Sequence, residues 1–141
     1  MSGPRVSPTS VIVAAVAYFV LGAVWFTVLS APWLEGIGKT REELMRGGNP
    51  ALAYLAAFVS DVVIAWALAW LIIATGQATA RRGALLGGLV WLGFVSTTMG
   101  TAVVFERRSL EDFAITAGYP FVGLLIMGII VGGWRKPQPA S

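Results

Sequence analysis

Asp61 is the residue whose type and position point most clearly to chemistry. It lies near the middle of a long apolar run, Pro50 to Thr75, that holds no other charged side chain. A carboxylate at the centre of a bilayer costs about 2.5–3.5 kcal/mol on insertion scales, so it must face protein or water rather than lipid. Such a group can bind a proton, a cation or a cationic substrate. It can equally act as a hydrogen-bonded carboxyl that ties helices together.

Few other polar residues can accompany Asp61. Helical spacing places Tyr54 two turns earlier, where it can line the same cavity. The third apolar run carries a cluster of hydroxyl side chains, beginning at Ser96, with which a structural carboxyl would bond. The candidate intramembrane polar site is made of Asp61, Tyr54, Thr97, Thr98 and Thr101.

The composition excludes several kinds of catalysis. The chain contains neither cysteine nor histidine. Disulfides, thiol nucleophiles, thiolate or imidazole metal sites and histidine-based acid–base catalysis are therefore ruled out. No nucleophile is paired with a base, so we expect no enzyme and no bound cofactor or metal.

Glycines are spaced for close helix packing. Gly83 and Gly87 open the third apolar run, Gly128 and Gly132 lie near the end of the fourth, and Gly22 lies in the first. Small residues let helices approach closely where no hydrophobic force drives them together. We expect these glycines to mediate packing within or between protomers. A phosphate-binding loop is not expected, because the strand–loop–helix context is missing.

Four long apolar runs must form the elements that position these residues. A membrane-spanning helix needs about 20 apolar residues, and the runs at about 10–30, 50–75, 83–105 and 110–134 meet that length. The first run is too long for a cleaved signal peptide, so we expect it to be retained. Asn49-Pro50 and Ser109 are typical helix starts. Residues 31–49 form an amphipathic loop, in which Thr40 predicts a short surface helix.

These runs predict an all-α membrane protein, with residues 1–141 forming a single domain. Its architecture is a four-transmembrane-helix bundle with short connections. The composition agrees, because 57% of residues are hydrophobic and only 12% are charged, whereas soluble domains carry about 25% charge.

The distribution of basic residues indicates a lipid partner. The net charge is +3, but the basic residues fall in short clusters between apolar runs. That placement suits anionic lipid headgroups and argues against nucleic acid. An even number of spans puts both termini on one side of the membrane. Lysines and arginines divide five against five between the two sides, and the Arg81-Arg82 turn leads us to expect cytoplasmic termini.

Several segments together resemble a known bacterial family. Gly22-Ala-Val-Trp25-Phe26, with Trp33 following, is similar to the signature of that family's first helix. The matching segments of the later runs, in the family's order, are 83–87, 90–94, 105–108, 117–119 and 125–128. The family is the one catalogued as domain of unknown function 1761, and the resemblance extends from about Val11 to Trp134.

The resemblance implies a small four-helix protein of the bacterial cytoplasmic (inner) membrane, with no established activity. Members often carry a histidine after the Gly-Tyr pair, where this chain has Pro120. A metal or proton role of that histidine in relatives is therefore in doubt here.

Two functions are open at this point. The first is a structural or accessory bundle that self-associates into a homo-oligomer or joins a larger membrane complex, with the glycine-rich third and fourth spans as the interface. The alternative is a small oligomeric transporter or channel in which Asp61 binds a proton or cation.

Overall fold

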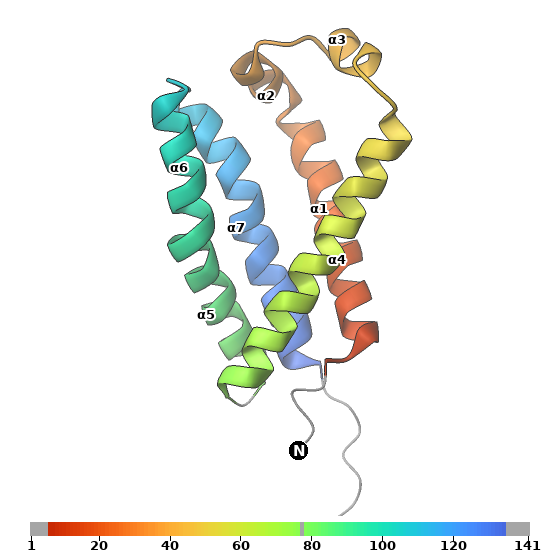
Figure 1. Cartoon of the computed structure of the whole chain (residues 1–141), viewed down its shortest axis with the longest axis vertical. Coiled ribbons are helices and arrows are strands. Elements are labelled where there is room, and N and C mark those ends of the chain that lie inside the picture. The colour runs from red at the N-terminus through yellow and green to blue at the C-terminus, as the bar shows by residue number, and fades with distance from the viewer. Residues whose placement is uncertain (1–5, 77, 135–141) are drawn as a thin grey trace, which may run out of the picture.

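The chain folds almost entirely into helices. A computed structural model describes residues 6–76 and 78–134. Its elements are α1 (Pro8–Val28), α2 (Ser30–Ile37), α3 (Arg41–Arg46), α4 (Pro50–Thr75), α5 (Ala80–Val90), the π-helical turn η1 (Trp91–Val95), α6 (Ser96–Phe105) and α7 (Leu110–Gly133) (Figure 1). The ends of the predicted domain, residues 1–5 and 135–141, lie outside the described residues.

Four helical segments are long and apolar enough to cross a membrane. They are α1, α4, the continuous stretch Ala80–Phe105 made of α5, η1 and α6, and α7. The predicted fold class, an all-α four-helix membrane bundle, is confirmed, and the chain is a multi-pass membrane protein. The first and third spans begin earlier than their apolar runs predict, because Ser7 and Thr79 cap them. The Ser7 Oγ accepts from the amide of Ser10 at 3.3 Å, and the Thr79 Oγ1 from that of Arg82 at 3.1 Å.

The segment between the first two spans contains two short helices. The predicted surface helix is α3, whose first turn is capped by the Thr40 hydroxyl accepting from the Glu43 amide at 3.1 Å. The other helix, α2, was not predicted. It ends at Gly38, whose φ of 69° is left-handed, and it packs against α7.

The core of the bundle is built around α7, which packs against α5, α1 and α4. Tyr18 of α1, Leu68 and Ile72 of α4, and Leu124 and Met127 of α7 belong to one buried apolar cluster. The start of α1 and the end of α7 lie at the same end of the bundle (Figure 1).

Glycines bring α5 and α7 into backbone contact. A Cβ atom added to Gly83 would overlap the carbonyl of Gly128, and one added to Gly87 would overlap that of Leu124. A Cβ atom added to Gly132 would likewise overlap the carbonyl of Thr79. The sequence alone is compatible with packing of these glycines within or between protomers. Gly83, Gly87, Gly128 and Gly132 pack within the chain, so they are not free to form the interface between copies that we expected.

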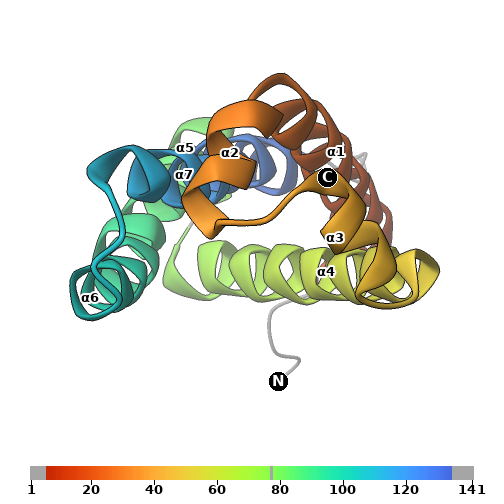
Figure 2. The same cartoon turned by 90° about the horizontal axis from the view of Figure 1, so that it is seen from above.

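The bundle is open along part of its length. The first turns of α4, residues 50–57, are exposed, and they diverge from α6 in both views (Figure 1 and Figure 2). In an 18-residue apolar stretch of the third span only 6% of residues are buried, compared with 39% in the corresponding stretch of α7. The α6 half of the third span therefore presents most of its surface outward.

Candidate functional site

Asp61 lies inside the bundle. It shares the buried face of α4 with Ala65, Leu68, Ala69 and Ile72, and only 5% of its surface is exposed. Its Oδ2 atom is buried and has no hydrogen-bond partner among the described residues. A buried carboxylate oxygen without a donor is costly, so a proton or a bound group at this atom would be stabilising.

Two tyrosines from other helices lie close enough to Asp61 to interact with it electrostatically. These are Tyr18 of α1 and Tyr119 of α7. Their rings are stacked, with centroids 4.5 Å apart, and the Tyr119 hydroxyl donates to the backbone carbonyl of Tyr18 at 3.3 Å. A phenol can both donate and accept a hydrogen bond. Asp61, Tyr18 and Tyr119 together, here called the Asp61 cluster, form a polar centre where three spans meet.

Two glycines make room for these rings. A Cβ on Gly22 would lie 2.7 Å from the Tyr119 hydroxyl oxygen, and one on Gly123 would overlap the ring of Tyr18. Gly22 was predicted to be a helix-packing residue, and it does lie at the contact between α1 and α7. Its partner there is an aromatic side chain rather than another backbone.

Two tryptophans support the α7 backbone beside Tyr119. Pro120 has no amide hydrogen, so the carbonyl four residues earlier, that of Thr116, loses its helical donor. The carbonyls on either side of Thr116 receive indole N–H donors. Trp25 donates to Ile115 at 2.9 Å and Trp91, in the π-helical turn, donates to Ala117 at 2.7 Å. π-helical turns often occur at functional positions.

The other residues of the predicted polar site do not join Asp61. Tyr54 is 64% exposed and its ring packs edge-on against Phe19, because this end of α4 extends away from α7. Thr97, Thr98 and Thr101 are exposed, and each donates to a carbonyl of its own helix. Their hydroxyls are therefore satisfied without Asp61.

The sequence contained a signal for Tyr18 and Tyr119, which accompany Asp61 in place of the predicted residues. Tyr18, Gly22 and Trp25 recur at helical spacing on one face of the first span, and Tyr119 precedes the one proline inside the fourth. Helical periodicity relates residues within one element, however, and it does not indicate which faces of separate spans will meet.

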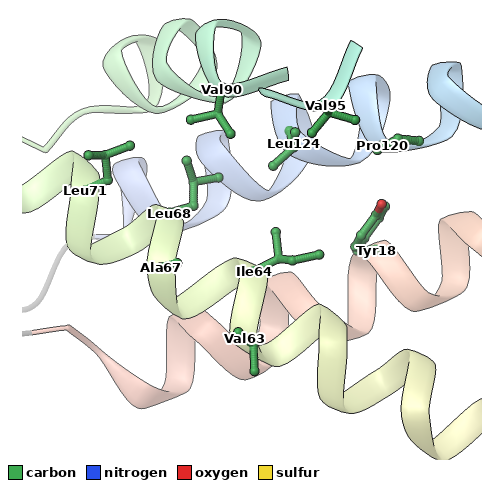
Figure 3. A pocket seen from close by; sticks show the side chains of 10 residues that line it. All are labelled: Tyr18, Val63, Ile64, Ala67, Leu68, Leu71, Val90, Val95, Pro120 and Leu124. Atoms are coloured by element: carbon green, nitrogen blue, oxygen red, sulfur yellow. The ribbon is translucent and has the colours of Figure 1, made fainter. Parts of the chain in front are cut away.

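An apolar cavity of about 330 Å³ lies beside the cluster (Figure 3). It is lined by α4 through Ile64 and Leu68, by Val90 and Val95 of the third span, by α7 and by Tyr18. Tyr18 provides the one polar side chain among the ten that line it. The cavity suits an apolar group, and its walls provide no polar path along which an ion could reach Asp61.

The carboxylates of the described residues are not grouped as a metal site. Within residues 6–76 and 78–134, no three histidine, cysteine or acidic side chains are arranged to hold a metal ion.

Comparison with known proteins identifies the family. Residues 9–132 match the family described as protein of unknown function (DUF1761). No curated protein and no solved structure matches the chain. Trp25 and Trp91, which the resemblance singled out, are the two side chains that donate to α7 beside Pro120. The match covers nearly all of the four spans, and the chain belongs to the DUF1761 family.

Proposed function

We propose that this protein is a structural or accessory membrane bundle that self-associates through the outward face of its third span. The observation that supports this most directly is the low burial of that span: 6% of the residues in its 18-residue apolar stretch are buried. The other three spans are 22% to 39% buried by the same measure. The α5 half of this span packs closely against α7, whereas the α6 half packs little within the chain. Most of the surface of α6 is therefore available for a second copy or for a larger membrane complex.

The residues on this face suit helix association in lipid. Gly93, Thr97 and Thr101 follow each other four residues apart and are all exposed. A Cβ on Gly93 would meet nothing within 4 Å, so this position is open to a neighbouring helix. Association in a bilayer depends on such small residues, because lipid provides no hydrophobic drive between helices. We call Gly93, Thr97 and Thr101 the α6 stripe.

Bulky substitutions in the α6 stripe test this proposal. The double variant Gly93→Leu/Thr97→Leu fills the stripe, and we expect it to weaken self-association by roughly tenfold or more, which corresponds to about 1.4 kcal/mol. The measurement is Förster resonance energy transfer between fluorescently labelled copies in liposomes, followed as added lipid dilutes the protein in the bilayer. Val59→Leu, on the exposed face of α4, is the control and should leave the transfer curve unchanged. A wild-type protein that shows no transfer above random proximity would rule out self-association.

A second candidate function is supported by the buried Oδ2 of Asp61, which has no partner among the described residues. In this alternative Asp61 binds a proton or a cation and the oligomer is a transporter or channel. Liposomes containing the wild type would show proton or cation flux, and Asp61→Asn would abolish it, whereas Glu42→Gln in the exposed helix α3 would not. The absence of flux, with loss of the oligomer in Asp61→Asn, would leave Asp61 with a structural role.

We infer further that the protein lies in the bacterial cytoplasmic membrane with both termini inside. The inference is supported by Arg81 and Arg82, which follow the second span at the end of the bundle where α1 begins. Because the chain has no cysteine, single cysteines at Ser7 and Lys39 can be labelled from outside spheroplasts. We expect Lys39→Cys to react and Ser7→Cys to be protected; the opposite pattern would reverse the orientation.

A further inference from the structure

A second, polar pocket lies at the end of the bundle opposite to the start of α1. Its volume is about 450 Å³. Its walls are α2, through Pro32, Glu35 and Gly36, and the connection from α6 to α7, residues 106–109, together with Glu111 and Asp112. Because it lies where the third span ends and the fourth begins, this pocket, here called the α2–α7 pocket, is at the boundary of the membrane.

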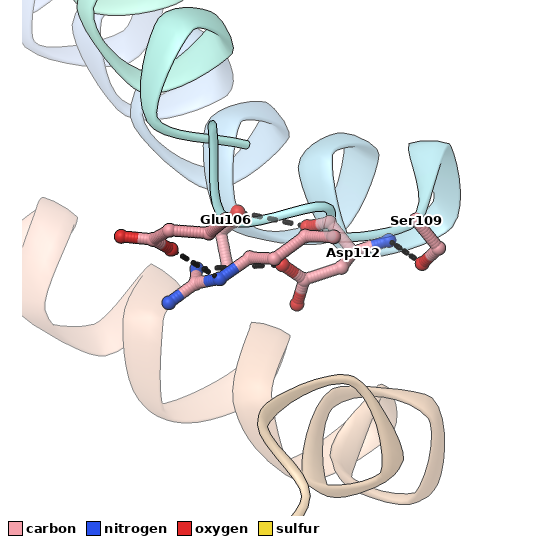
Figure 4. A network of polar contacts seen from close by, with 5 residues as sticks. Glu106, Ser109 and Asp112 are labelled. Carbon is pink, nitrogen blue, oxygen red and sulfur yellow. Dashed lines mark hydrogen bonds and ion pairs between the residues drawn. The ribbon is translucent and has the colours of Figure 1, made fainter. Parts of the chain in front are cut away.

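The pocket carries more negative than positive charge. Four carboxylates line it, from Glu35, Glu106, Glu111 and Asp112, against two guanidinium groups. Arg108 is engaged twice, with Glu106 at 2.8 Å and with the Oδ2 of Asp112 at 3.4 Å (Figure 4). In the part of the chain that the structure describes, Glu35 and Glu111 take part in no ion pair. The electrostatics of the pocket therefore favour an additional cation.

Asp112 is the buried member of this group. Only 1% of its surface is exposed, and its Oδ1 atom has no hydrogen-bond partner among the described residues. The Asp112 carboxylate is not needed as the N-terminal cap of α7, because the Ser109 hydroxyl already caps this helix by accepting from the Asp112 amide at 3.0 Å. The carboxylate instead lies against α2, where a Cβ on Gly36 would be 2.6 Å from Oδ1. A buried carboxyl oxygen without a donor among the described residues is a place where a group bound in the pocket would supply the missing hydrogen bond.

The surroundings of the pocket suit an amphiphile. Phe105 and Leu110, on the two sides of the connection, are 84% and 81% exposed, so apolar surface adjoins the polar pocket directly. Arg107 lines the pocket and takes part in no ion pair within the described ranges. Its guanidinium group is suited to binding a phosphate in a bidentate manner.

We propose that the α2–α7 pocket binds the headgroup of a zwitterionic aminophospholipid. The primary ammonium group donates to the carboxylates of Asp112, Glu111 and Glu35, since it offers three hydrogen-bond donors and a positive charge. The phosphate pairs with Arg107, and the acyl chains extend over the apolar surface at Phe105 and Leu110. A zwitterionic headgroup pairs with both the carboxylates and the guanidinium group of Arg107. A metal cation would pair with the carboxylates alone.

Lipid competition tests the proposal. The protein is purified in detergent with equal amounts of phosphatidylethanolamine and phosphatidylcholine that have matched acyl chains, and retained lipid is measured by native mass spectrometry. The choline headgroup has the same charges but no N–H donor. We expect the wild type to retain phosphatidylethanolamine roughly tenfold more strongly, and Asp112→Asn to remove this preference. Equal retention of both lipids by the wild type would overturn the proposal.

Two further variants keep the test decisive. If Asp112→Asn does not fold, Glu111→Gln provides the test, because Glu111 is exposed and its substitution should not disturb folding. We expect Glu111→Gln to lower the preference for phosphatidylethanolamine several-fold. Glu42→Gln removes the same charge from α3, outside the pocket, and should leave the preference intact; a loss there as large as in Glu111→Gln would contradict the assignment. If free ethanolamine binds as tightly as phosphatidylethanolamine, the pocket recognises a free amine and the proposal of a lipid ligand is wrong.

Discussion

Two acidic side chains show how differently a buried carboxylate can be placed in this protein. Asp61 and Asp112 are 5% and 1% exposed, and each has one oxygen without a partner among the described residues. Asp61 lies inside the bundle, close enough to Tyr18 and Tyr119 for an electrostatic interaction, whereas Asp112 is paired through its other oxygen with Arg108. Asp61 is conspicuous in the sequence because it is the one charged residue in the middle of an apolar run. Asp112 was not among the predicted site residues, because an acidic residue in the first turn of a helix is ordinary.

The indole of Trp91 should contribute to stability through its hydrogen bond to the Ala117 carbonyl, 2.7 Å away. Trp91→Phe keeps an aromatic ring and removes the donor, so we expect a loss of about 1 kcal/mol of unfolding free energy. Equilibrium unfolding in detergent measures this loss. The control is Trp66→Phe, since Trp66 is 53% exposed on α4. Equal effects of the two variants would show that the hydrogen bond is not responsible.

Gly83 should tolerate no side chain. A methyl group there would overlap the Gly128 carbonyl, so Gly83→Ala must push α5 away from α7. Overpacking of this kind typically costs about 1–3 kcal/mol, and a lowered midpoint of thermal unfolding would report it. Gly88→Ala is the matched control, because its Cβ would make only an ordinary contact, 3.6 Å from a methyl carbon of Leu125. A stable Gly83→Ala variant would mean that the two helices are less closely packed than described.

At the scale of the helix, the sequence predicted what depends on local rules. Length and apolarity gave the four spans, and Asn49, Thr40 and Ser109 cap the helices they were expected to cap. The arrangement of the helices depends on which faces meet, and apolar residues all round each span leave that undetermined. For this reason Tyr54, Thr97, Thr98 and Thr101 were grouped with Asp61, while its actual neighbours, Tyr18 and Tyr119, were not.

The start of α7 provides a prediction about an element. Ser109 caps this helix through the Asp112 amide, and loss of such a cap typically costs about 1 kcal/mol. Ser109→Ala should therefore lower the unfolding free energy by about that amount. Ser96→Ala, which removes only a hydroxyl bonded to its own helix, should have a much smaller effect. A Ser109→Ala variant as stable as the wild type would show that water replaces the cap without loss.

At the scale of the whole molecule, the chain is tightly packed on one side and open on the other. Glycine contacts join α5 to α7 within the chain, while α6 and the first turns of α4 diverge (Figure 2). The glycines that were expected to form the interface between copies are thus used internally. The small-residue surface left for a partner is the α6 stripe, and the proposal of self-association depends on it.

Disulfide cross-linking in native membranes tests that proposal most directly. The chain has no cysteine, so Thr97→Cys introduces the single thiol of the protein. Two such thiols form a disulfide only when their Cβ atoms come within about 3.5–4.5 Å. We predict that mild oxidation converts Thr97→Cys to a covalent dimer, while Val59→Cys on the exposed face of α4 stays monomeric. A monomeric Thr97→Cys, or equal cross-linking at both positions, would contradict self-association through the α6 stripe.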